Sequence, residues 1–518
     1  MADDAAALAA LRARLAGCAD VETLADAAIQ VARCVPVTGA TMQDAELAEL
    51  FAPGVQAVSC SMETSSEAQG MCTADLDLLN QIGALEHKGA VVTHILQTYL
   101  RPLFAKAAQH SRVQDNGRAA AGARPLVWEE QQTIWNDGSG AQNVLGWCVR
   151  MLSRGDVAAW ERVWPLVVPP IMVLLDAPGA RPKLYGACTV CEMLAKDAPA
   201  RVPAPLLQRT GLADLLHDAL SNALHHISDA ECGAMLLYAA LSARSYLACT
   251  LHPCFDETAD AYEAYASIFS DGVLAALSYC APASASAPAL PAPSGTALGS
   301  ARLQQALAGV ASVWICRLCA ELGTSVLRYW NAYMDWAAAW VANAFDACSS
   351  LDAAPRRSMT SVVTEIADGD AGGDDASLSA SGQWTEATRV LLTSVALSVR
   401  GTQALVDRAT DASNEQKGPG ILRLPAQLPG LHRWATEVVC ACAKCYVRLS
   451  ELASQARETP GAPATERVRT IIEALRTLCV TLRAVDPELD QVRLLLCSHP
   501  PTWDALHRLD AVRPFLAT

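Results

Sequence analysis

The stretch from Trp164 to Leu220 is the part of the sequence that most constrains the fold. It holds a long apolar segment, a short Pro/Gly turn at 177–179, a second helical segment, another Pro-marked turn and a third helical segment. Helices joined by such short turns lie antiparallel, and each pair buries its apolar face only against its neighbours. Helix pairs of this kind recur about every 40 residues along the chain, the spacing of HEAT-type repeats.

The composition also favours helices. Apolar residues make up 52% of the chain but aromatic residues only 5%, and alanine, the best helix former, supplies much of the difference. Alternating runs of Val, Ile and Tyr, which are typical of strands, are scarce. At 518 residues the chain exceeds what one hydrophobic core usually serves. The predicted fold class is therefore all-α, a right-handed α-solenoid of HEAT-like antiparallel helix pairs.

Shifts in composition predict six segments. Two of them lack enough large apolar side chains to repay the entropy of ordering, one because of Pro, Ala and Ser and the other because of Asp and Gly. The predicted order is an N-terminal helical region at 1–125, a central HEAT-like block at 126–280, a Pro/Ala/Ser linker at 281–300, a helical hairpin at 301–350, an acidic disordered linker at 351–382 and C-terminal helical repeats at 383–518.

Charge and targeting signals limit the classes of partner and the cellular compartment that we expect for this protein. The net charge is −15 and no basic cluster exceeds Arg356-Arg357, which argues against direct nucleic-acid binding. The acidic start of the sequence does not resemble a signal peptide, and the longest uncharged apolar run, 163–175, is too short to span a bilayer. The 19 cysteines lack the spacing of a disulfide framework, so we expect reduced thiols in a cytoplasmic and nuclear protein without membrane contact.

No catalytic motif appears in the sequence: there is no phosphate loop, no Gly-x-Ser-x-Gly elbow and no His-Glu-x-x-His. The function is therefore predicted to be non-enzymatic binding, with no cofactor. Closely spaced cysteines fall within predicted helices and are expected to be buried core thiols rather than zinc ligands. They are Cys188 with Cys191, Cys316 with Cys319, and Cys440, Cys442 and Cys445.

One zinc site remains as an alternative. Cys249, His252 and Cys254 fall on a predicted loop beside a proline and would supply three ligands, with Cys232 as a conceivable fourth. The pair His225-His226 is instead predicted to lie in the last turn of a helix, where partial positive charge is favoured by the helix dipole.

A stripe of aromatic side chains marks the predicted hairpin. Tyr329, Tyr333, Trp336 and Trp340 follow helical spacing on one face. Such a stripe more often packs against an adjacent helix than binds a cofactor. Because Trp and Tyr dominate interface hot spots, a protein-binding face stays open as the alternative.

The central stretch resembles a known family. The resemblance rests on Val168-Pro169-Pro170-Ile171, Leu174-Leu175-Asp176, Lys183 with Gly186, the segment from Leu206 through Arg209, Thr210 and Gly211 to Leu212, and Asp218-Ala219-Leu220. In this order and spacing they are similar to the Tel-two-interacting protein two family, one of the three subunits of the Triple T cochaperone complex. The chain departs from the family pattern at Ala177, where a second Asp is expected, and at 228–231, which reads Ser-Asp-Ala-Glu in place of Thr-Pro-Glu-Glu.

The resemblance implies a function that composition and spacing alone do not. It implies an α-solenoid that joins the other two Triple T subunits. With the ninety-kilodalton heat-shock chaperone and its R-two-T-P adaptor, these stabilise newly made phosphatidylinositol-three-kinase-related kinases, which links the protein to DNA-damage and TOR signalling.

Within the matching stretch, three residues are expected to shape the helices. Pro169-Pro170 is predicted to lie at a bend or in the first turn of a following helix, because proline pairs break or kink helices. Gly186 is predicted to permit a close approach between helices.

The turn residues are expected to satisfy helix ends. Arg209 is predicted to donate to helix-end carbonyls, and Thr210, before Gly211, to cap the next helix. Asp176 and Lys183 are predicted to pair across the turn between their helices. These residues, with Tyr333, Trp336 and Trp340, either shape the solenoid or contact a partner directly, and the sequence leaves both readings open.

Two rival functions remain. Another HEAT-type adaptor, such as a nuclear-transport receptor or a polymerase-assembly factor, would share the helix pattern. A zinc-dependent or thiol enzyme would use the scattered cysteines instead.

Overall fold

The computed structural model describes the chain in segments. These are 21–33, 88–108, 140–152, 157–195, 202–252, 259–280, 296–329, 332–334, 336–337, 340, 393–407, 471, 474 and 477. Within them, every regular element is a helix and no strand occurs, so the all-α class is confirmed. The chain divides into two compact units, Met1–Ala264 and Tyr265–Thr518.

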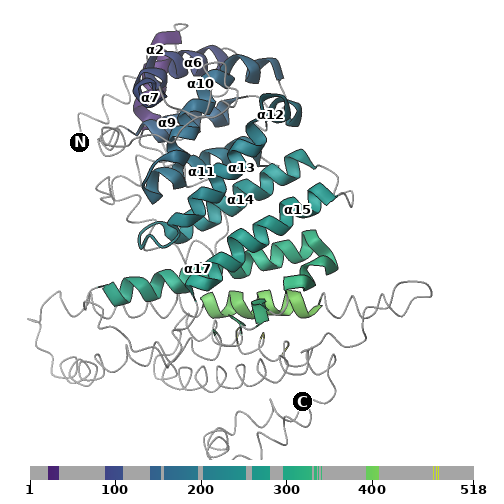
Figure 1. Cartoon of the computed structure of the whole chain (residues 1–518). Coiled ribbons are helices and arrows are strands. Elements are labelled where there is room, and N and C mark those ends of the chain that lie inside the picture. The colour runs from purple at the N-terminus through teal and green to yellow at the C-terminus, as the bar shows by residue number, and fades with distance from the viewer. Residues whose placement is uncertain are drawn as a thin grey trace, which may run out of the picture. The chain divides into compact units, whose positions relative to one another are not determined.

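The first unit carries most of the described helices (Figure 1). They are α2 (Val21–Ala32), α6 (Lys88–Ile95), the π-helical η1 (Leu96–Leu100), α7 (Arg101–Ala108), α9 (Ala141–Met151), α10 (Val157–Asp176), α11 (Ala180–Leu194), α12 (Ala204–Thr210), α13 (Leu212–Ala223), the 3-10 helix η2 (Leu224–His226) and α14 (Gly233–Leu251). The helix α15 (Ala259–Ser267) crosses the boundary between the units.

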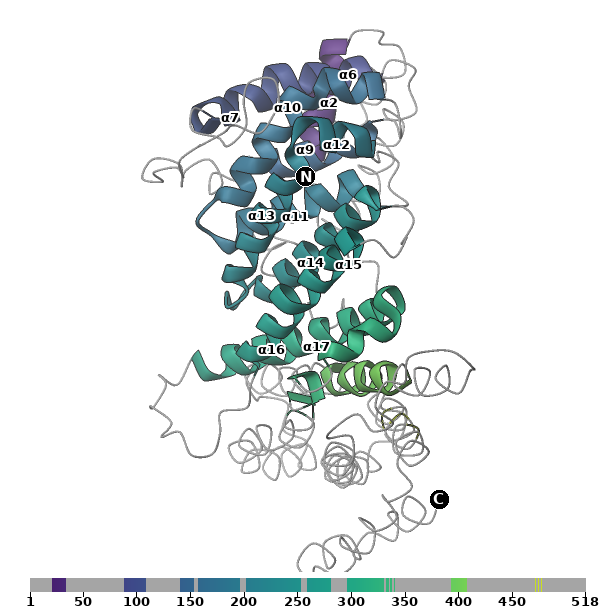
Figure 2. The same ribbon diagram turned by 45° about the vertical axis from the view of Figure 1, so that its right-hand side comes forward.

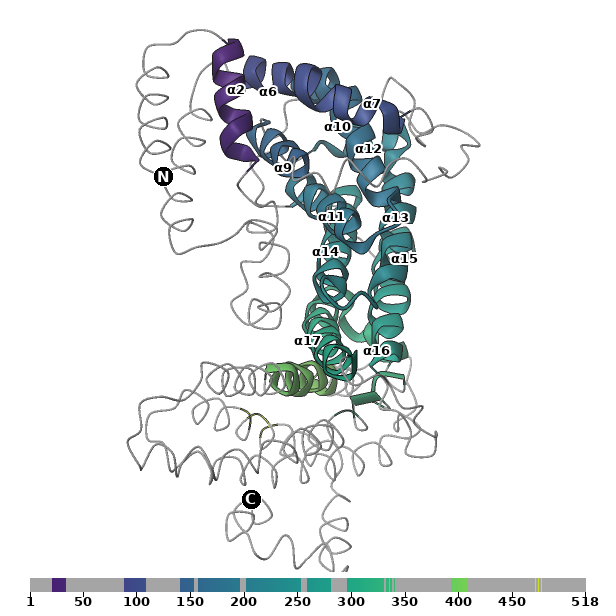
Figure 3. The same ribbon diagram turned by 90° about the vertical axis from the view of Figure 1, so that its left-hand side faces the viewer.

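Helices of the first unit stack in two layers. Figures 2 and 3 show α9, α11 and α14 following one another in one layer, with α10 and α13 beside them in the other. Consecutive members touch: α11 packs against α9 and α14 within its layer and against α10 and α13 across it, while α7 packs on α10. The dense run of short-turned helices predicted from the sequence is therefore present between 140 and 252.

The helix α11 is buried along most of its length. Of its 15 residues, 12 are buried, and they include the charged Lys183 and Glu192, while Arg181, Pro182 and Tyr185 are partly exposed. The buried polar groups have no access to water, so each needs a partner inside the protein.

The proline pair lies inside a helix. Pro169 and Pro170 lie well within α10, as does Pro165, so the predicted place in the first turn of a following helix is wrong, while the predicted bend stays a prediction. Each proline lacks the N–H that would bond the carbonyl four residues earlier, which frees the carbonyls of Glu161, Pro165 and Leu166. Glu161 is exposed and Pro165 and Leu166 are half-buried, so the freed carbonyls belong to the more accessible face of α10.

Burial of the opposite face offsets that loss. Trp160 and Trp164 lie on this face, with ring centroids 5.9 Å apart in an edge-to-face arrangement, and both are buried. Aromatic side chains of this size contribute several kcal/mol each when they leave water, on the order of a lost helical hydrogen bond or more. The packing of α10 therefore overrides its low helix propensity.

Three described helices are long and apolar enough to cross a membrane by length and composition alone. They are Val157–Asp176, Gly233–Leu251 and Arg302–Leu322, and 56%, 78% and 67% of their apolar windows are buried inside the protein. The longest uncharged apolar run, 163–175, is too short to span a bilayer, but these three helices are long enough because each includes one or more charged residues. Their apolar side chains are mostly packed against other helices of the same chain.

The second unit contains a further group of helices. They are the π-helical η3 (Ile268–Leu274), α16 (Ala275–Tyr279), α17 (Thr296–Leu322), the 3-10 helix η4 (Gly323–Tyr329), helical residues between 332 and 340, and a helix at 393–407. The helix α17 begins at Thr296, so the last five residues of the predicted 281–300 linker are helical. Of the predicted C-terminal repeats at 383–518, only 393–407, 471, 474 and 477 are described, and the acidic 351–382 segment lies outside the described residues.

Gly186 marks the close approach between α10 and α11 that the sequence predicted. A Cβ at this position would lie 2.9 Å from both Cγ and Cδ2 of Leu175 and 3.1 Å from Cβ of Leu174. Leu174 and Leu175 are themselves buried, so neither side chain has free space into which to move. The backbones of the two layers meet at this glycine.

We predict that Gly186→Ala lowers the free energy of unfolding by about 1–3 kcal/mol, because the added methyl overpacks the contact with Leu175. Gly89→Ala is the matched control: Gly89 is also helical, and a Cβ there would meet nothing within 4 Å. That variant should be unchanged or gain up to about 1 kcal/mol from the higher helix propensity of alanine. Chemical denaturation of both variants measures the difference, and equal effects would show that the contact at Gly186 is not tight.

Candidate functional site

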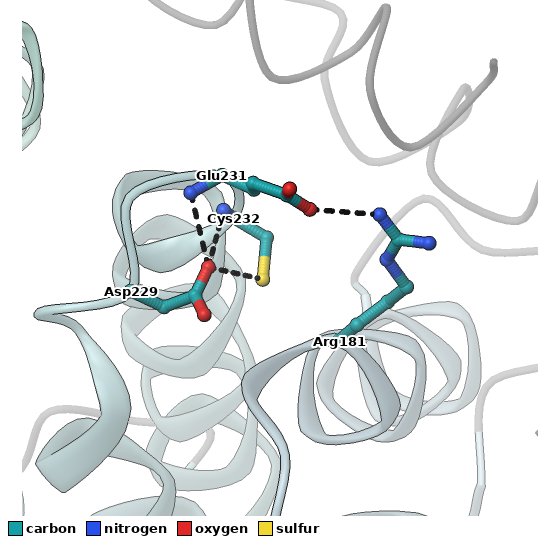
Figure 4. Close-up of polar contacts among 4 residues, drawn as sticks. All are labelled: Arg181, Asp229, Glu231 and Cys232. Atoms are coloured by element: carbon teal, nitrogen blue, oxygen red, sulfur yellow. Dashed lines mark hydrogen bonds and ion pairs between the residues drawn. The ribbon is translucent and has the colours of Figure 1, made fainter. Parts of the chain in front are cut away.

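Two loops of the first unit meet at one edge of the stack. The turn between α10 and α11 lies beside the loop between α13 and α14, and Figure 4 shows the polar contacts between them. Arg181, at the start of α11, donates from Nη2 to Oε2 of Glu231 over 2.9 Å. Both side chains are exposed, at 39% and 63%, so the ion pair contributes little to stability and leaves charge on the surface. We call Arg181, Asp229 and Glu231 the loop edge.

Asp229 orders the loop from within. Its Oδ1 accepts hydrogen bonds from the main-chain N–H groups of Glu231 and Cys232, each over 3.0 Å, and lies 3.3 Å from the Cys232 thiol (Figure 4). A carboxylate in this position accepts hydrogen bonds from the free N–H groups before α14, and the positive end of the α14 dipole stabilises its charge. The Ser-Asp-Ala-Glu sequence that departs from the family pattern thus forms a capped turn.

Gly233 closes the same turn. Its N–H donates to the carbonyl of Asp229 over 2.9 Å, and a Cβ at Gly233 would lie 2.1 Å from the carbonyl oxygen of Ile227. No side chain fits at that distance, so α14 must begin with glycine. Backbone contacts therefore order the loop that carries Asp229 and Glu231, and the side chains of Arg181 and Glu231 remain solvent-exposed.

Lys183 lies behind the loop edge and is buried. Its Nζ donates to the main-chain carbonyl of Leu175 over 2.7 Å, which satisfies one of the carbonyls left open at the C-terminus of α10. The negative end of the α10 dipole also stabilises the Lys183 ammonium. The pairing of Lys183 with Asp176 stays a prediction.

The histidine pair lies where the sequence placed it, and its second member, His226, is not favoured as a cation. His225 and His226 form the last turn after α13. Burial, followed by the nearby Lys183 ammonium and His225, lowers the pKa of His226 below its ordinary value, while Asp229 opposes the shift. The neutral imidazole is therefore favoured at this helix end, which corrects the expectation that the dipole would dominate.

Arg209 and Thr210 do not act as predicted. Arg209 forms an exposed ion pair with Glu161 of α10 and does not donate to a helix-end carbonyl. Thr210 is the last residue of α12, and its Oγ1 donates back to the carbonyls of Leu206 and Leu207, over 2.7 and 3.2 Å, rather than capping α13. A Thr hydroxyl within a helix reaches the preceding turn of its own helix, which is why the cap fails.

Gly211 joins α12 to α13 without any side-chain cap. Its φ of 69° and ψ of 16° are left-handed, and its N–H donates to the carbonyl of Gln208. This conformation suits glycine and costs other residues about 1–2 kcal/mol. The Thr-Gly-Leu turn is therefore a glycine-dependent helix stop, with Thr210 supporting the helix that ends there.

The aromatic stripe lies in the second unit and is largely covered. Tyr333, Trp336 and Trp340 are buried, and the rings of the two tryptophans stack with centroids 5.6 Å apart. Tyr329 is half-buried and stacks on Phe269 with centroids 4.4 Å apart. Of the two readings that the sequence left open, this placement favours packing over an exposed protein-binding face.

Most of the described cysteines are buried, as expected of core thiols, whereas Cys249 and Cys316 are half-buried. Cys188 and Cys191 are buried in α11, where the Cys191 thiol lies 3.4 Å from the carbonyl of Ala239 and burial raises its pKa. Cys316 and Cys319 both lie in α17. Thiols with raised pKa values are poor nucleophiles and poor metal ligands.

The zinc alternative loses part of its geometry. Cys249 lies in α14 and His252 at its end, rather than on a loop, while Cys254 and the group at 440–445 lie outside the described residues. Burial raises the pKa of Cys232, and its thiol lies against Asp229. Among the residues that the structure describes, no group of three His, Cys, Asp or Glu side chains is placed to hold a metal ion.

Sequence reasoning missed two buried charged residues. Glu192 in α11 lies 3.7 Å from Arg150 of α9, and burial raises the pKa of its carboxyl while Arg150 lowers it by less. Arg244 in α14 is also buried, with its Nη2 3.1 Å from Nε2 of His217. Arginine is donor-only, so His217 accepts at Nε2. Glu192 and Arg244 are each a single charged residue within an apolar helical segment. That pattern in the sequence would have indicated a buried charge at both positions.

Where the structure describes the chain, these features define an all-helical protein in which the buried Lys183, Glu192 and Arg244 each contact a group of another helix. A match to the Tti2 family model covers residues 56–345, more than half of the 518-residue chain. The chain belongs to the Tti2 family, as the resemblance indicated. No curated protein and no solved structure matches the chain.

We predict that Lys183→Met lowers the free energy of unfolding by about 1–3 kcal/mol, because the buried carbonyl of Leu175 loses its donor. Arg181 lies two residues before Lys183 in the sequence, and Arg181→Met, which removes the exposed ion pair to Glu231, should change the free energy of unfolding by less than about 1 kcal/mol. Urea denaturation of both variants compares them. A larger loss for Arg181→Met would show that stability depends on the loop edge rather than on the buried cap.

We predict that Glu192→Gln gains stability over the wild type as the pH rises. Because the folded-state pKa of Glu192 is raised from about 4.5, the folded protein binds the proton more tightly than the unfolded chain does. The wild type therefore loses stability as the pH rises from about 4.5 through the raised pKa, and the variant does not. Melting temperatures across this range measure the difference; a constant difference would contradict the prediction, and values below pH 4.5 serve as the internal control.

Proposed function

We propose that the chain is a non-enzymatic scaffold subunit of the Triple T cochaperone complex. The observation that carries the proposal is the family match over residues 56–345, which includes the described helices of the first unit from α6 to α14 and also the helices α15, α16 and α17. The Tti2 family is a family of cochaperone-complex subunits rather than of enzymes. The buried thiols with raised pKa values and the polar groups used for capping support a binding role.

The two-layer stack supports the further proposal of a HEAT-like α-solenoid. In the first unit, α9, α11 and α14 form one layer, and each helix buries its apolar side chains against the next in line and against the second layer. A stack of this kind has no central core and can extend by adding helix pairs. It presents long lateral faces and a row of inter-helix loops, which suit a subunit that holds several partners.

The partners follow from the family. They are the other two Triple T subunits and, through them, the ninety-kilodalton heat-shock chaperone with its R-two-T-P adaptor. The clients are phosphatidylinositol-three-kinase-related kinases, so the protein would act in DNA-damage and TOR signalling in the cytoplasm and the nucleus. Direct contact with nucleic acid or a membrane is not part of the proposal.

Affinity purification of the tagged chain from its native cells, with mass spectrometry of the partners, tests the proposal. We expect the other two Triple T subunits in near-stoichiometric amounts. Recovery of the Ran GTPase or of polymerase subunits instead would support a transport receptor or assembly factor and overturn the proposal. Zinc content of the same sample distinguishes the enzyme alternative, since a structural or catalytic site would retain about one zinc per chain.

A further inference from the structure

A buried network of hydroxyl groups joins three helical segments of the second unit. Ser312 of α17 has its Oγ 3.2 Å from Oγ of Ser398 in the helix at 393–407. Tyr333 donates from its hydroxyl to the carbonyl of Ser398 over 3.3 Å, and the same hydroxyl lies 3.3 Å from Oγ1 of Thr402. All four side chains are buried, so these contacts form away from water.

Each small hydroxyl of the network is also anchored to its own helix. Oγ of Ser312 lies 2.7 Å from the carbonyl of Ala308, Oγ of Ser398 lies 2.9 Å from that of Ser394, and Oγ1 of Thr402 lies 2.8 Å from that of Ser398. The contacts across the interface therefore need no reorganisation of the helices that supply them. Buried hydrogen bonds of this kind favour one register between packed helices, because a shift would separate the buried Tyr333 hydroxyl from its partners Ser398 and Thr402.

A glycine lets the helices come close enough for the network to form. A Cβ at Gly401 would lie 3.0 Å from the Tyr333 hydroxyl and 3.2 Å from the carbonyl oxygen of Ser312. The apolar side chains of Val395, Val399 and Leu405 are buried along the same helix. Figure 1 shows this helix, in light green, lying alongside α17. The interface thus combines apolar burial, a backbone-close contact and directional hydrogen bonds.

The helix at 393–407 lies beyond the family match, which ends at residue 345. The sequence prediction placed a domain boundary at 351–382 and assigned the hairpin and the C-terminal helices to separate domains. The contacts place Ser398, Gly401 and Thr402 against the hairpin instead. We propose that residues 393–407 are a docking helix for the face made by Ser312 and Tyr333, and that this helix binds there without needing the covalent connection through residues 341–392.

The test uses the full chain with a site-specific protease sequence inserted between Gly372 and Gly373. After cleavage, size-exclusion chromatography under native conditions should recover the two fragments as one species. Gly401→Leu, which places a bulky side chain against Tyr333 and Ser312, should raise the dissociation constant of the fragments at least tenfold. Asp407→Leu, which adds the same side chain at an exposed position of the same helix, should leave it unchanged.

Two results would overturn the proposal. Separation of the cleaved wild-type fragments would show that the covalent connection is required. Fragments carrying Gly401→Leu that bind as tightly as the wild type would show that another contact holds them. The double variant Tyr333→Phe with Thr402→Val removes hydroxyls without adding bulk and should weaken binding by less than Gly401→Leu; circular dichroism of the uncut chains confirms that each variant keeps its helical content.

Discussion

The burial of α11 between helices of both layers is the constraint on which the first unit depends. Such a helix needs a small residue where it approaches a neighbouring helix closely. It also needs a partner for each polar group that it buries. Gly186 meets the first condition against Leu174 and Leu175. Lys183 meets the second by donating to the carbonyl of Leu175, so that one side chain of α11 completes the end of α10. The two layers are joined at one point both by close packing and by a hydrogen bond.

This arrangement explains why charged residues occur inside an apolar stack. Lys183, Glu192 and Arg244 are buried, and each lies against a group from another helix. A buried charge costs free energy unless a partner compensates it, and the raised pKa of Glu192 shows that Arg150 compensates only in part. Such contacts add little net stability, but they penalise any other register of the helices.

The sequence predicted the helices and the glycine contact because both depend on local or regular properties. Alanine content, short turns and apolar spacing determine where helices form, and a glycine within an apolar helical segment indicates a close approach. The polar roles failed for Arg209 and Thr210, because the partner of a long or rotatable polar side chain depends on which helix lies beside it. Arg209 forms its ion pair with Glu161, which lies 48 positions earlier in the sequence, and the spacing of residues within a helix cannot predict a contact over that separation.

Tertiary packing also decides the prolines of α10 and the aromatic stripe. The pair Pro169-Pro170 lies inside α10 rather than in the first turn of a following helix, and buried Trp160 and Trp164 stabilise α10 on its other face. For the aromatic stripe the sequence favoured packing against a helix but left a docking face open, since nothing in the sequence shows what covers the rings. In the structure Tyr333 is covered by a helix more than 60 residues further along the chain.

That covering helix changes where partner surfaces should be sought. An aromatic stripe binds another protein only if its own chain leaves it exposed, and the contacts of Ser398 and Thr402 with Tyr333 leave little of this one available. The loop edge has the opposite character: Asp229 and Gly233 hold its backbone in one geometry, while Arg181 and Glu231 keep their charges in solvent. Ordered backbone with exposed charge lowers the entropy lost on binding and favours steering of a charged partner. The apolar side chains of the described helices are largely buried against one another, whereas the loop edge combines an ordered backbone with accessible charge.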